Sequence, residues 1–161
     1  MSGTASGVHV WRAELDEAEA VGELLIGFRN HLGLDWPSDN AFLAGVDRLI
    51  EDPNTAYLLA APDPDSPPMG VAQARFRYGL WWAAEDCLLE DLFVHDDARG
   101  KGLGRALLQG VVDLARERGC RRIELDTNER NDTAVALYRS FGFDATDKRY
   151  GARNLLFRLH L

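Results

Sequence analysis

A glycine-rich loop joins an apolar segment to an amphipathic segment in the second half of the sequence, at Arg99–Gly104. The first amides of a helix lack acceptors within that helix, and glycines let an anion approach those amides closely. Basic side chains in and after the loop add positive charge, and arginine can hold phosphate oxygens with two parallel hydrogen bonds. The sequence therefore predicts a strand, a pyrophosphate-binding loop and a helix in that order, and the expected contacts come from Arg99, Gly100, Lys101, Gly102, Leu103, Gly104 and Arg105.

Two better-known phosphate-binding motifs do not fit this loop. A Walker A loop places lysine and then serine or threonine after its last glycine, whereas Arg105 follows Gly104 here. The dinucleotide-binding fingerprint counted from Gly100 needs a glycine at position 105. A plain flexible turn is the remaining alternative, and the coincidence of glycines and cations with a strand-to-helix junction disfavours it.

Composition limits the classes of protein that this chain can represent. With 161 residues, 46% hydrophobic and 27% charged, we expect one globular domain over residues 1–161, with residues 1–7 disordered. The formal net charge of −8 disfavours a nucleic-acid partner and favours a cationic small molecule. Cys87 and Cys120 show no paired spacing and the histidines are scattered, so we expect no disulfide framework and no metal. No segment resembles a signal peptide or a membrane span, which predicts a cytoplasmic protein with no membrane partner.

Periodicity in the first half of the chain predicts strands and two helices. Asp16, with Glu19 three residues later, resembles a capping box that opens the first helix, and Ser38 is expected to cap the second. Strands are expected over His9–Glu14, Thr55–Ala61 and Met69–Arg77, and the last two should pair in an antiparallel manner. The apolar stripes of the helices are Val21, Leu24, Leu25, Phe28 and Leu32, and Phe42, Val46, Leu49 and Ile50.

The second half predicts a parallel strand, helix, strand unit followed by another helix and strand. Tyr78–Asp86 is expected to be a loop or a strand end. The long helix should run from the glycine loop to a cap at Gly119, with a right-handed crossover. Strands are expected over Leu88–Val94, Arg122–Asp126 and Leu155–Leu161, and a final helix from Asn131 or Asp132 to Gly142.

Two adjacent carboxylates, Glu90 and Asp91, interrupt the apolar run Leu88–Val94. An unpaired charge is costly to bury, so something must compensate for them. Neighbouring residues of a regular strand face opposite sides of the sheet, so regular geometry cannot bring both carboxylates to one site, although a bulge can re-aim one of them. Two interpretations stay open: salt-bridged carboxylates near a strand end, or carboxylates of which at least one is catalytic or binds substrate.

Several of these features together resemble the GNAT superfamily of acyl-CoA-dependent N-acetyltransferases. They are the apolar strand, the Arg-x-x-Gly-x-Gly pattern at 99–104, Asn131 at a helix start, Tyr138, and the helix ending Phe141-Gly142-Phe143. The resemblance covers Leu88–Phe143 closely. The strand running into Arg99 is similar to the diamine and thialysine acetyltransferase branch, which is related to the spermidine/spermine acetyltransferases. By position alone, Tyr138 would be read as a core residue with a satisfied hydroxyl.

The resemblance implies an α/β fold with an α+β mixed sheet, the GNAT fold. Its central sheet would be mostly antiparallel and splayed at the strand that carries Glu90, with about four helices packed on both faces. It also implies acetyl-CoA as the acyl donor, with the pyrophosphate in the glycine loop. Further contacts to the donor would come from Asn131 and from the main chain of Leu92, Phe93 and Val94.

The resemblance further implies roles for three side chains. Glu90 would help to deprotonate the amine, Tyr138 would protonate the leaving thiolate, and Asp91 would bind a cationic substrate. Apart from the resemblance, the aromatic side chain of Trp82 could line the substrate pocket or pack internally. Neither cysteine lies in a nucleophile motif, which favours direct transfer in a ternary complex.

The expected activity is N-acetylation of a primary amine on a small molecule that is polyamine-like or amino-acid-like. An aminoglycoside or a protein N-terminus is the alternative acceptor. A different class of protein, a non-catalytic CoA-binding regulatory module, could use the same loop. Because dimers are common in the family, the resemblance also implies a homodimer. The strand expected at Leu155–Leu161 could pair with the second subunit or only complete the sheet of its own subunit.

Overall fold

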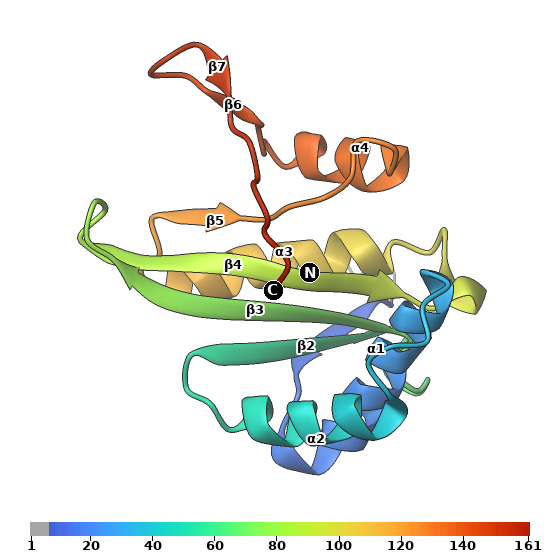
Figure 1. Cartoon of the computed structure of the whole chain (residues 1–161). Coiled ribbons are helices and arrows are strands. Elements are labelled where there is room, and N and C mark those ends of the chain that lie inside the picture. The colour runs from blue at the N-terminus through green and yellow to red at the C-terminus, as the bar shows by residue number, and fades with distance from the viewer. Residues whose placement is uncertain (1–6) are drawn as a thin grey trace. The chain divides into compact units, whose positions relative to one another are not determined.

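The structure is a computed structural model that describes residues 7–161 (Figure 1). The chain forms two compact units, of which the first ends at Glu124 and the second comprises Leu125–Leu161. The disorder expected at the N-terminus concerns residues that, except for Gly7, lie outside the described part. Within residues 7–161, no helix combines the length and the apolarity needed to cross a bilayer. The single-domain prediction stays a prediction.

The first unit is built on a five-stranded sheet with the strand order β1-β2-β3-β4-β5. Strands β1 to β4 pair in an antiparallel manner, and β5 joins β4 in parallel. The strands are β1 His9–Arg12, β2 Thr55–Ala61, β3 Gly70–Gly79, β4 Ala84–Val94 and β5 Arg122–Glu124. The mostly antiparallel mixed sheet expected from the sequence is confirmed.

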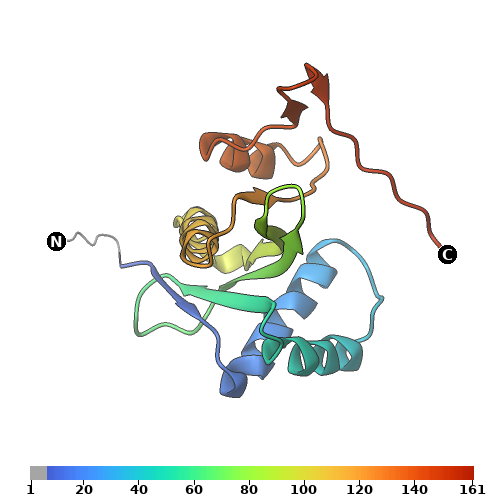
Figure 2. The ribbon, with the colours of Figure 1, turned by 90° about the vertical axis from the view of Figure 1, so that its left-hand side faces the viewer.

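Three helices cover the two faces of this sheet, with α1 and α2 on one face and α3 on the other (Figures 1 and 2). They are α1 Ala18–His31, α2 Asp39–Ile50 and α3 Leu103–Glu117. Two neighbouring residues of β2 point to the two faces. Leu59 belongs to the core with α1 and α2. Leu58 faces α3, since a Cβ added at Gly110 of that helix would lie 3.0 Å from its side chain. Because both faces are covered, every residue of β2 is buried, as is usual for a strand between two helical layers.

The core beneath α1 and α2 is made of the apolar stripes that the sequence predicts. Val21, Leu24, Leu25 and Val46 pack on Tyr57, Leu59, Val71 and Phe93. The predicted cap of α2 is confirmed, because the N–H of Ala41 donates to Ser38 Oγ at 3.2 Å. The two helices also approach closely at Gly22, where a Cβ would lie 2.6 Å from Leu43 Cδ2.

The capping box expected at Asp16 and Glu19 is wrong. A short 3₁₀ turn, Leu15–Glu17, precedes α1, so the reciprocal contact lies earlier in the chain. The N–H of Glu14 donates to Glu17 Oε1 at 3.1 Å, and Trp11 Nε1 donates to the other oxygen of Glu17 at 2.8 Å. The indole contact ties this turn to β1.

The loop expected over Tyr78–Asp86 is mostly strand. The β3–β4 ladder continues to the pair Gly79–Ala84, and only residues 80–83 form the turn. Ion pairs hold this polar end of the hairpin: Arg118 contacts Glu85 with two hydrogen bonds of 2.8 and 3.1 Å, and Arg122 contacts Asp86 with two of 3.1 Å. These partners lie far from the hairpin in the sequence, so local periodicity does not reveal the strands.

The second unit contains α4, Asp132–Ser140, and a small hairpin of β6 Thr146–Asp147 and β7 Ala152–Arg153. The final helix is confirmed, and Gly142 after its end has a φ of +96°, which favours glycine. The strand expected over Leu155–Leu161 is wrong, because no regular secondary structure follows Arg153. The alternating apolar residues meet no partner strand among the described residues, and Leu155, Leu156, Phe157, Leu159 and Leu161 are exposed.

Candidate active site

Strand β4 changes register against β3 at the predicted pair of carboxylates. Gln73 pairs with Asp91, whereas the next residue of β3, Ala74, pairs with Leu89. Glu90 is therefore the extra residue of a β-bulge, and Glu90 and Asp91 together lie opposite Gln73.

The bulge brings both carboxylates to the face of the sheet that α1 and α2 cover. Asp91 is in register with Gln73, and Gln73 with Tyr57, which belongs to the core beneath those helices. On the other side of the bulge, Leu88 pairs with Arg75, which lies two residues from Gln73 and therefore on the same face of β3. Glu90 lies two residues after Leu88, so it points to this face as well. In a regular strand, Glu90 and Asp91 would point to opposite faces of the sheet.

The electrostatics of this region agree with the register. Burial, followed by the charge of Glu90, raises the pKa of Asp91 to about 6. Burial, followed by the charge of Asp91, raises the pKa of Tyr57 to about 12, to which Glu90 also contributes. Among the described residues, no cation forms an ion pair with Glu90 or Asp91. The interpretation as salt-bridged carboxylates is therefore not supported.

The same segment of β4 extends beyond its pairing with β5. Strand β5 pairs with β4 only at Asp86–Leu88, so Leu89–Val94 has β3 on one side and no β5 partner on the other. This is the splay expected at the strand that carries Glu90. The main chain of Leu92, Phe93 and Val94, the predicted pantetheine contacts, lies in this segment.

The glycine loop ends in a helix start that is suited to an anion. Gly100 and Gly102 have φ values of +78° and +85°, a backbone conformation that favours glycine. Gly102 is the N-cap of α3 and provides no side-chain cap, and the first turn contains no acidic residue. The first intrahelical bond runs from Ala106 N to Gly102 O at 3.0 Å, so the amides of Leu103 and Gly104 have no acceptor within the helix. These groups fit the phosphates of a nucleotide-bearing donor.

Arg99 is tied to the end of β4. Its Nε donates to the Val94 carbonyl at 3.1 Å and lies 3.2 Å from an Asp96 carboxylate oxygen, and its guanidinium lies 5.9 Å from the centre of the Phe93 ring. The arginine therefore holds the end of the strand against the loop that precedes α3. Its role as a phosphate contact stays a prediction.

Asn131 and Tyr138 belong to the second unit. Asn131 is the N-cap of α4, and its Oδ1 accepts from Ala134 N at 3.3 Å. Tyr138 lies edge-on to Phe143 at 5.8 Å between ring centres, and burial raises its pKa. A phenol whose pKa lies above 10 keeps its proton at neutral pH.

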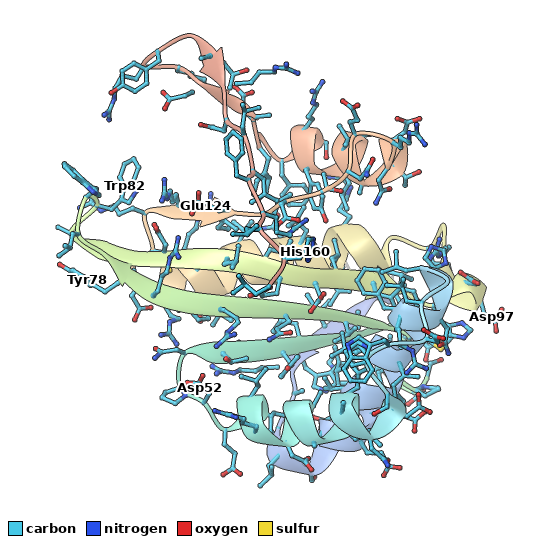
Figure 3. The ribbon with its side chains drawn as sticks, viewed as in Figure 1. Asp52, Tyr78, Trp82, Asp97, Glu124 and His160 are labelled. Atoms are coloured by element: carbon cyan, nitrogen blue, oxygen red, sulfur yellow. The ribbon has the colours of Figure 1, made fainter. Side chains whose placement is uncertain are left out.

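Trp82 lies in the β3–β4 turn, where the Arg122 guanidinium is 5.1 Å from the centre of its ring. Figure 3 shows Trp82 and Tyr78 at one end of the sheet and Asp97 at the other. Gln73 at the bulge and Gly79 at the turn lie six positions apart along β3, a distance of about 20 Å. The structure therefore does not bring Trp82 to the acidic pair, and its role in substrate binding stays a prediction.

Sequence reasoning missed Tyr57 and Gln73. Both are buried, with 2% and 6% of their surface exposed, and both lie in register with Asp91 across β2, β3 and β4. The only local signal is a glutamine within the apolar run that begins β3. Their proximity to Asp91 depends on strand pairing, which the local sequence does not show.

Both cysteines are free thiols. Burial raises the pKa of Cys87 to about 12 and also raises that of Cys120. Neither thiol is ionised at neutral pH, and the thiolate is the nucleophilic form. This chemistry agrees with transfer that uses no cysteine nucleophile. Residues 7–161 contain no group of three or more histidine, cysteine or acidic side chains that could hold a metal ion.

Comparisons with known proteins agree with this geometry. An aminoglycoside N(6')-acetyltransferase type 1 from Stenotrophomonas maltophilia is 29% identical over 89% of this chain and 91% of its own length. A thialysine N-epsilon-acetyltransferase from Bos taurus is 32% identical over 54% of this chain and 52% of its own length. The crystal structure of a protein from Arthrobacter sp. FB24, described as a "putative acetyltransferase", superposes with a TM-score of 0.85 at 27% identity over 99% of both chains.

The family match covers most of the molecule. Residues 9–143 match the family described as Acetyltransferase (GNAT) family. The expected fold, the N-acetyltransferase activity and the use of acetyl-CoA are thereby confirmed. The match spans well over half of the chain, and the chain therefore belongs to the acetyltransferase (GNAT) family.

Proposed function

We propose that the protein acetylates the primary amine of a small cationic molecule by direct transfer from acetyl-CoA in a ternary complex. The observation that carries the proposal is the bulge at Glu90, which places two carboxylates on one face of β4, neither of which forms an ion pair within residues 7–161. They lie on the strand segment whose outer edge has no β5 partner. A positively charged acceptor would supply the missing charge.

The donor would bind along the end of β4 and the start of α3. The main chain of Leu92–Val94 would pair with the pantetheine arm, and the loop Arg99–Arg105 would hold the pyrophosphate. The uncapped amides of α3 and the absence of acidic residues in its first turn support this assignment. Asn131 would provide a further contact to the donor.

Glu90 and Tyr138 would handle the two protons of the reaction. An alkylammonium with a pKa of about 10.4 is neutral in about one molecule in 2,500 at pH 7, a deficit of about 4.6 kcal/mol. Glu90 would accept that proton directly or through water, after which the nitrogen–carbon bond forms and the carbon–sulfur bond breaks. Tyr138 would donate its proton to the departing thiolate, and the raised pKa of its phenol keeps that proton available at neutral pH.

The acceptor would be polyamine-like or amino-acid-like, with an aminoglycoside as the second candidate. The net charge of −8 favours any of these cations. The aminoglycoside candidate is favoured by the relative from Stenotrophomonas maltophilia, which aligns over 89% of this chain. The thialysine acetyltransferase relative favours a lysine-like amine.

Thiol release from acetyl-CoA tests the proposal. The purified protein would be offered diamines, thialysine, amino acids, aminoglycosides and a peptide with a free N-terminus, and the acetylated product would be identified by mass. We expect selective turnover of one class of small amine. Coenzyme binding without thiol release from any amine would instead support the non-catalytic regulatory module.

Tyr138→Phe tests the proposed role of Tyr138 as the general acid. The variant should slow thiol release by about 10²-fold and leave the affinity for coenzyme A nearly unchanged. Tyr150→Phe is the matched control, because Tyr150 belongs to the same unit and is 74% exposed. A fully active Tyr138→Phe enzyme would remove Tyr138 from this role.

The oligomeric state, the location and the domain count also belong to the proposal. We expect a homodimer, supported by the exposed apolar side chains of Leu155–Leu161, and light scattering would test it. We expect a cytoplasmic protein, supported by two free cysteines. A family match that extends across both compact units supports one catalytic domain.

A further inference from the structure

We propose that Tyr57, Gln73 and Asp91 form a row that selects amine acceptors carrying a hydroxyl group within about 10 Å of the reacting nitrogen. This inference rests on the proposed function, because it concerns the acceptor of the same reaction. It adds a preference among amines that neither the family nor the two carboxylates alone would give.

The row is defined by strand register. Tyr57 of β2 pairs with Gln73 of β3, and Gln73 pairs with Asp91 of β4. Side chains of residues that pair across neighbouring strands point to the same face of the sheet. Neighbouring strands lie about 4.8 Å apart, so the row across β2, β3 and β4 spans about 10 Å. All three side chains face the side that α1 and α2 cover, where Tyr57 joins their core.

The polar ends of the row have no hydrogen-bond partner in the part of the chain that the structure describes. Within residues 7–161, no hydrogen bond engages the Tyr57 hydroxyl, the Gln73 amide or the Asp91 carboxylate. Yet no buried side-chain nitrogen or oxygen of the described part lacks a hydrogen-bond partner. The polar atoms of Tyr57 and Gln73 therefore reach solvent, although these residues are only 2% and 6% exposed.

Buried polar side chains without partners are uncommon, because desolvation costs free energy that a hydrogen bond must offset. Tyr57 and Gln73 are two such side chains whose polar atoms only solvent reaches, and with the partly buried Asp91 in the same register row they indicate a surface that a ligand completes. The position of the bulge supports this, since the register shift aligns Asp91 with Gln73 and so completes the row.

Charge sets the direction in which an acceptor would lie. Asp91 and Glu90 form the negative end of the row, and Arg75 is held near Asp52 with 4.0 Å between their charged atoms. Asp91, Arg75 and Glu90 all influence the pKa of Tyr57, so they lie within electrostatic reach of its hydroxyl. The ammonium would lie at the Asp91 end, and a neutral polar group of the acceptor would lie over Gln73 or Tyr57.

A hydroxyl is the group that both neutral side chains suit. The Gln73 amide both donates and accepts, and the Tyr57 hydroxyl does the same, as does an alcohol. A plain alkylamine would cover these groups and leave them unpaired. A site built to hydrogen-bond a hydroxyl rejects the analogue that lacks it much more strongly than an apolar site rejects an extra methylene.

The test compares amines of equal length with and without a hydroxyl. 3-Amino-1-propanol, 4-amino-1-butanol, 5-amino-1-pentanol and 1,3-diamino-2-propanol would be paired with the corresponding alkylamines and 1,3-diaminopropane. Each kcat/KM would be corrected for the fraction of free amine. We expect the wild-type enzyme to prefer at least one hydroxylated amine over its partner by about tenfold or more.

Gln73→Met and Tyr57→Phe should each reduce that preference by about fivefold or more, mainly through KM, without changing coenzyme affinity. Gln109→Met and Tyr78→Phe are the matched controls, because both residues are exposed and lie outside the row. Thermal unfolding would establish that the variants fold, and Gln73→Leu, which also removes the amide and is close in size, replaces a Gln73→Met protein that does not.

The outcomes separate the two proposals. Turnover without a preference for any hydroxylated amine, or a preference that survives both Gln73→Met and Tyr57→Phe, overturns the row and leaves the proposed function intact. The absence of thiol release with every amine overturns the proposed function and the inference that rests on it.

Discussion

The two halves of β4 treat their carboxylates in opposite ways. Near the start of the strand, Glu85 and Asp86 each receive two hydrogen bonds from an arginine, and Asp86 is only 4% exposed. Further along the same strand, Glu90 and Asp91 have no ion-pair partner among the described residues. Strand β5 pairs with the first half at Asp86–Leu88, whereas within the five-stranded sheet the second half pairs with β3 only.

Within one strand, this difference separates carboxylates that stabilise the fold from carboxylates that are available to a ligand. A paired carboxylate stabilises the hairpin, and removing its partner leaves an uncompensated charge. A partly buried carboxylate without an ion-pair partner, such as Asp91, opposes folding when it is ionised and stays available to a cationic ligand. The comparison predicts that equivalent substitutions in the two halves have opposite effects.

The largest expected effect is on catalysis. Glu90→Gln should lower kcat by about 10²–10⁴-fold, since the amide cannot accept the ammonium proton. Its thermal stability should stay near that of the wild type. Glu85→Gln should show the reverse, with weaker binding to Arg118, a loss of about 1 kcal/mol of stability and kcat within about twofold. Steady-state kinetics and melting curves would measure kcat and stability for both variants. A similar loss of kcat in both would contradict the prediction.

The next effect is on stability. Asp86→Asn should lower the free energy of unfolding by about 2 kcal/mol, because it breaks a buried pair with Arg122. The loss should fall short of that for a fully enclosed pair, since the Arg122 side chain is 39% exposed. Urea unfolding at neutral pH would measure the loss. An Asp86→Asn protein as stable as the wild type would show that this half of β4 does not depend on its charges.

Asp91→Asn should instead raise stability by about 1–2 kcal/mol at pH 7. The pKa of Asp91 is raised to about 6 in the folded protein, so ionisation opposes folding at neutral pH. The folded state holds this proton more tightly than the unfolded state, so the wild type loses stability as pH rises from about 4 through 6. The gain from Asp91→Asn should therefore be near zero at pH 4 and complete at pH 7. Urea unfolding across this range would test the sign, and a gain that shrinks as pH rises would contradict it.

The smallest effect concerns two glycines at the two ends of α3. Gly102 and Gly119 have φ values of +85° and +77°, and a Cβ at either would meet nothing within 4 Å. Alanine at either position should therefore cost about 1 kcal/mol of stability through backbone strain alone. Only Gly102→Ala should also weaken coenzyme A binding, by about tenfold, because it disturbs the amides at the helix start. Calorimetry would compare the two, and equal affinities would remove the loop from donor binding.

The sequence predicts the parts of this molecule whose causes are local. Glycines at positive φ and neighbouring cations mark the start of α3, and Ser38 marks that of α2. Apolar stripes identify the helix faces that form the core. The family resemblance then joins these pieces into one fold.

The sequence does not predict features that depend on pairing. The apolar run Leu88–Val94 hides the alternation that would reveal the bulge. The outer end of the β3–β4 hairpin depends on Arg118 and Arg122, which lie far along the chain. Leu155–Leu161 has the pattern of a strand, and yet a strand requires a neighbour, which no described segment provides.

The single extra residue at Glu90 is an insertion that β4 absorbs without changing the strand on either side of it. Deleting it would make Leu89 and Asp91 consecutive partners of Ala74 and Gln73, so the side chains from Asp91 to Val94 would keep their faces of the sheet. Phe93 would also keep its stack with Phe28. The bulge therefore adds a second carboxylate beside Asp91 while the interior of the enzyme stays as it is.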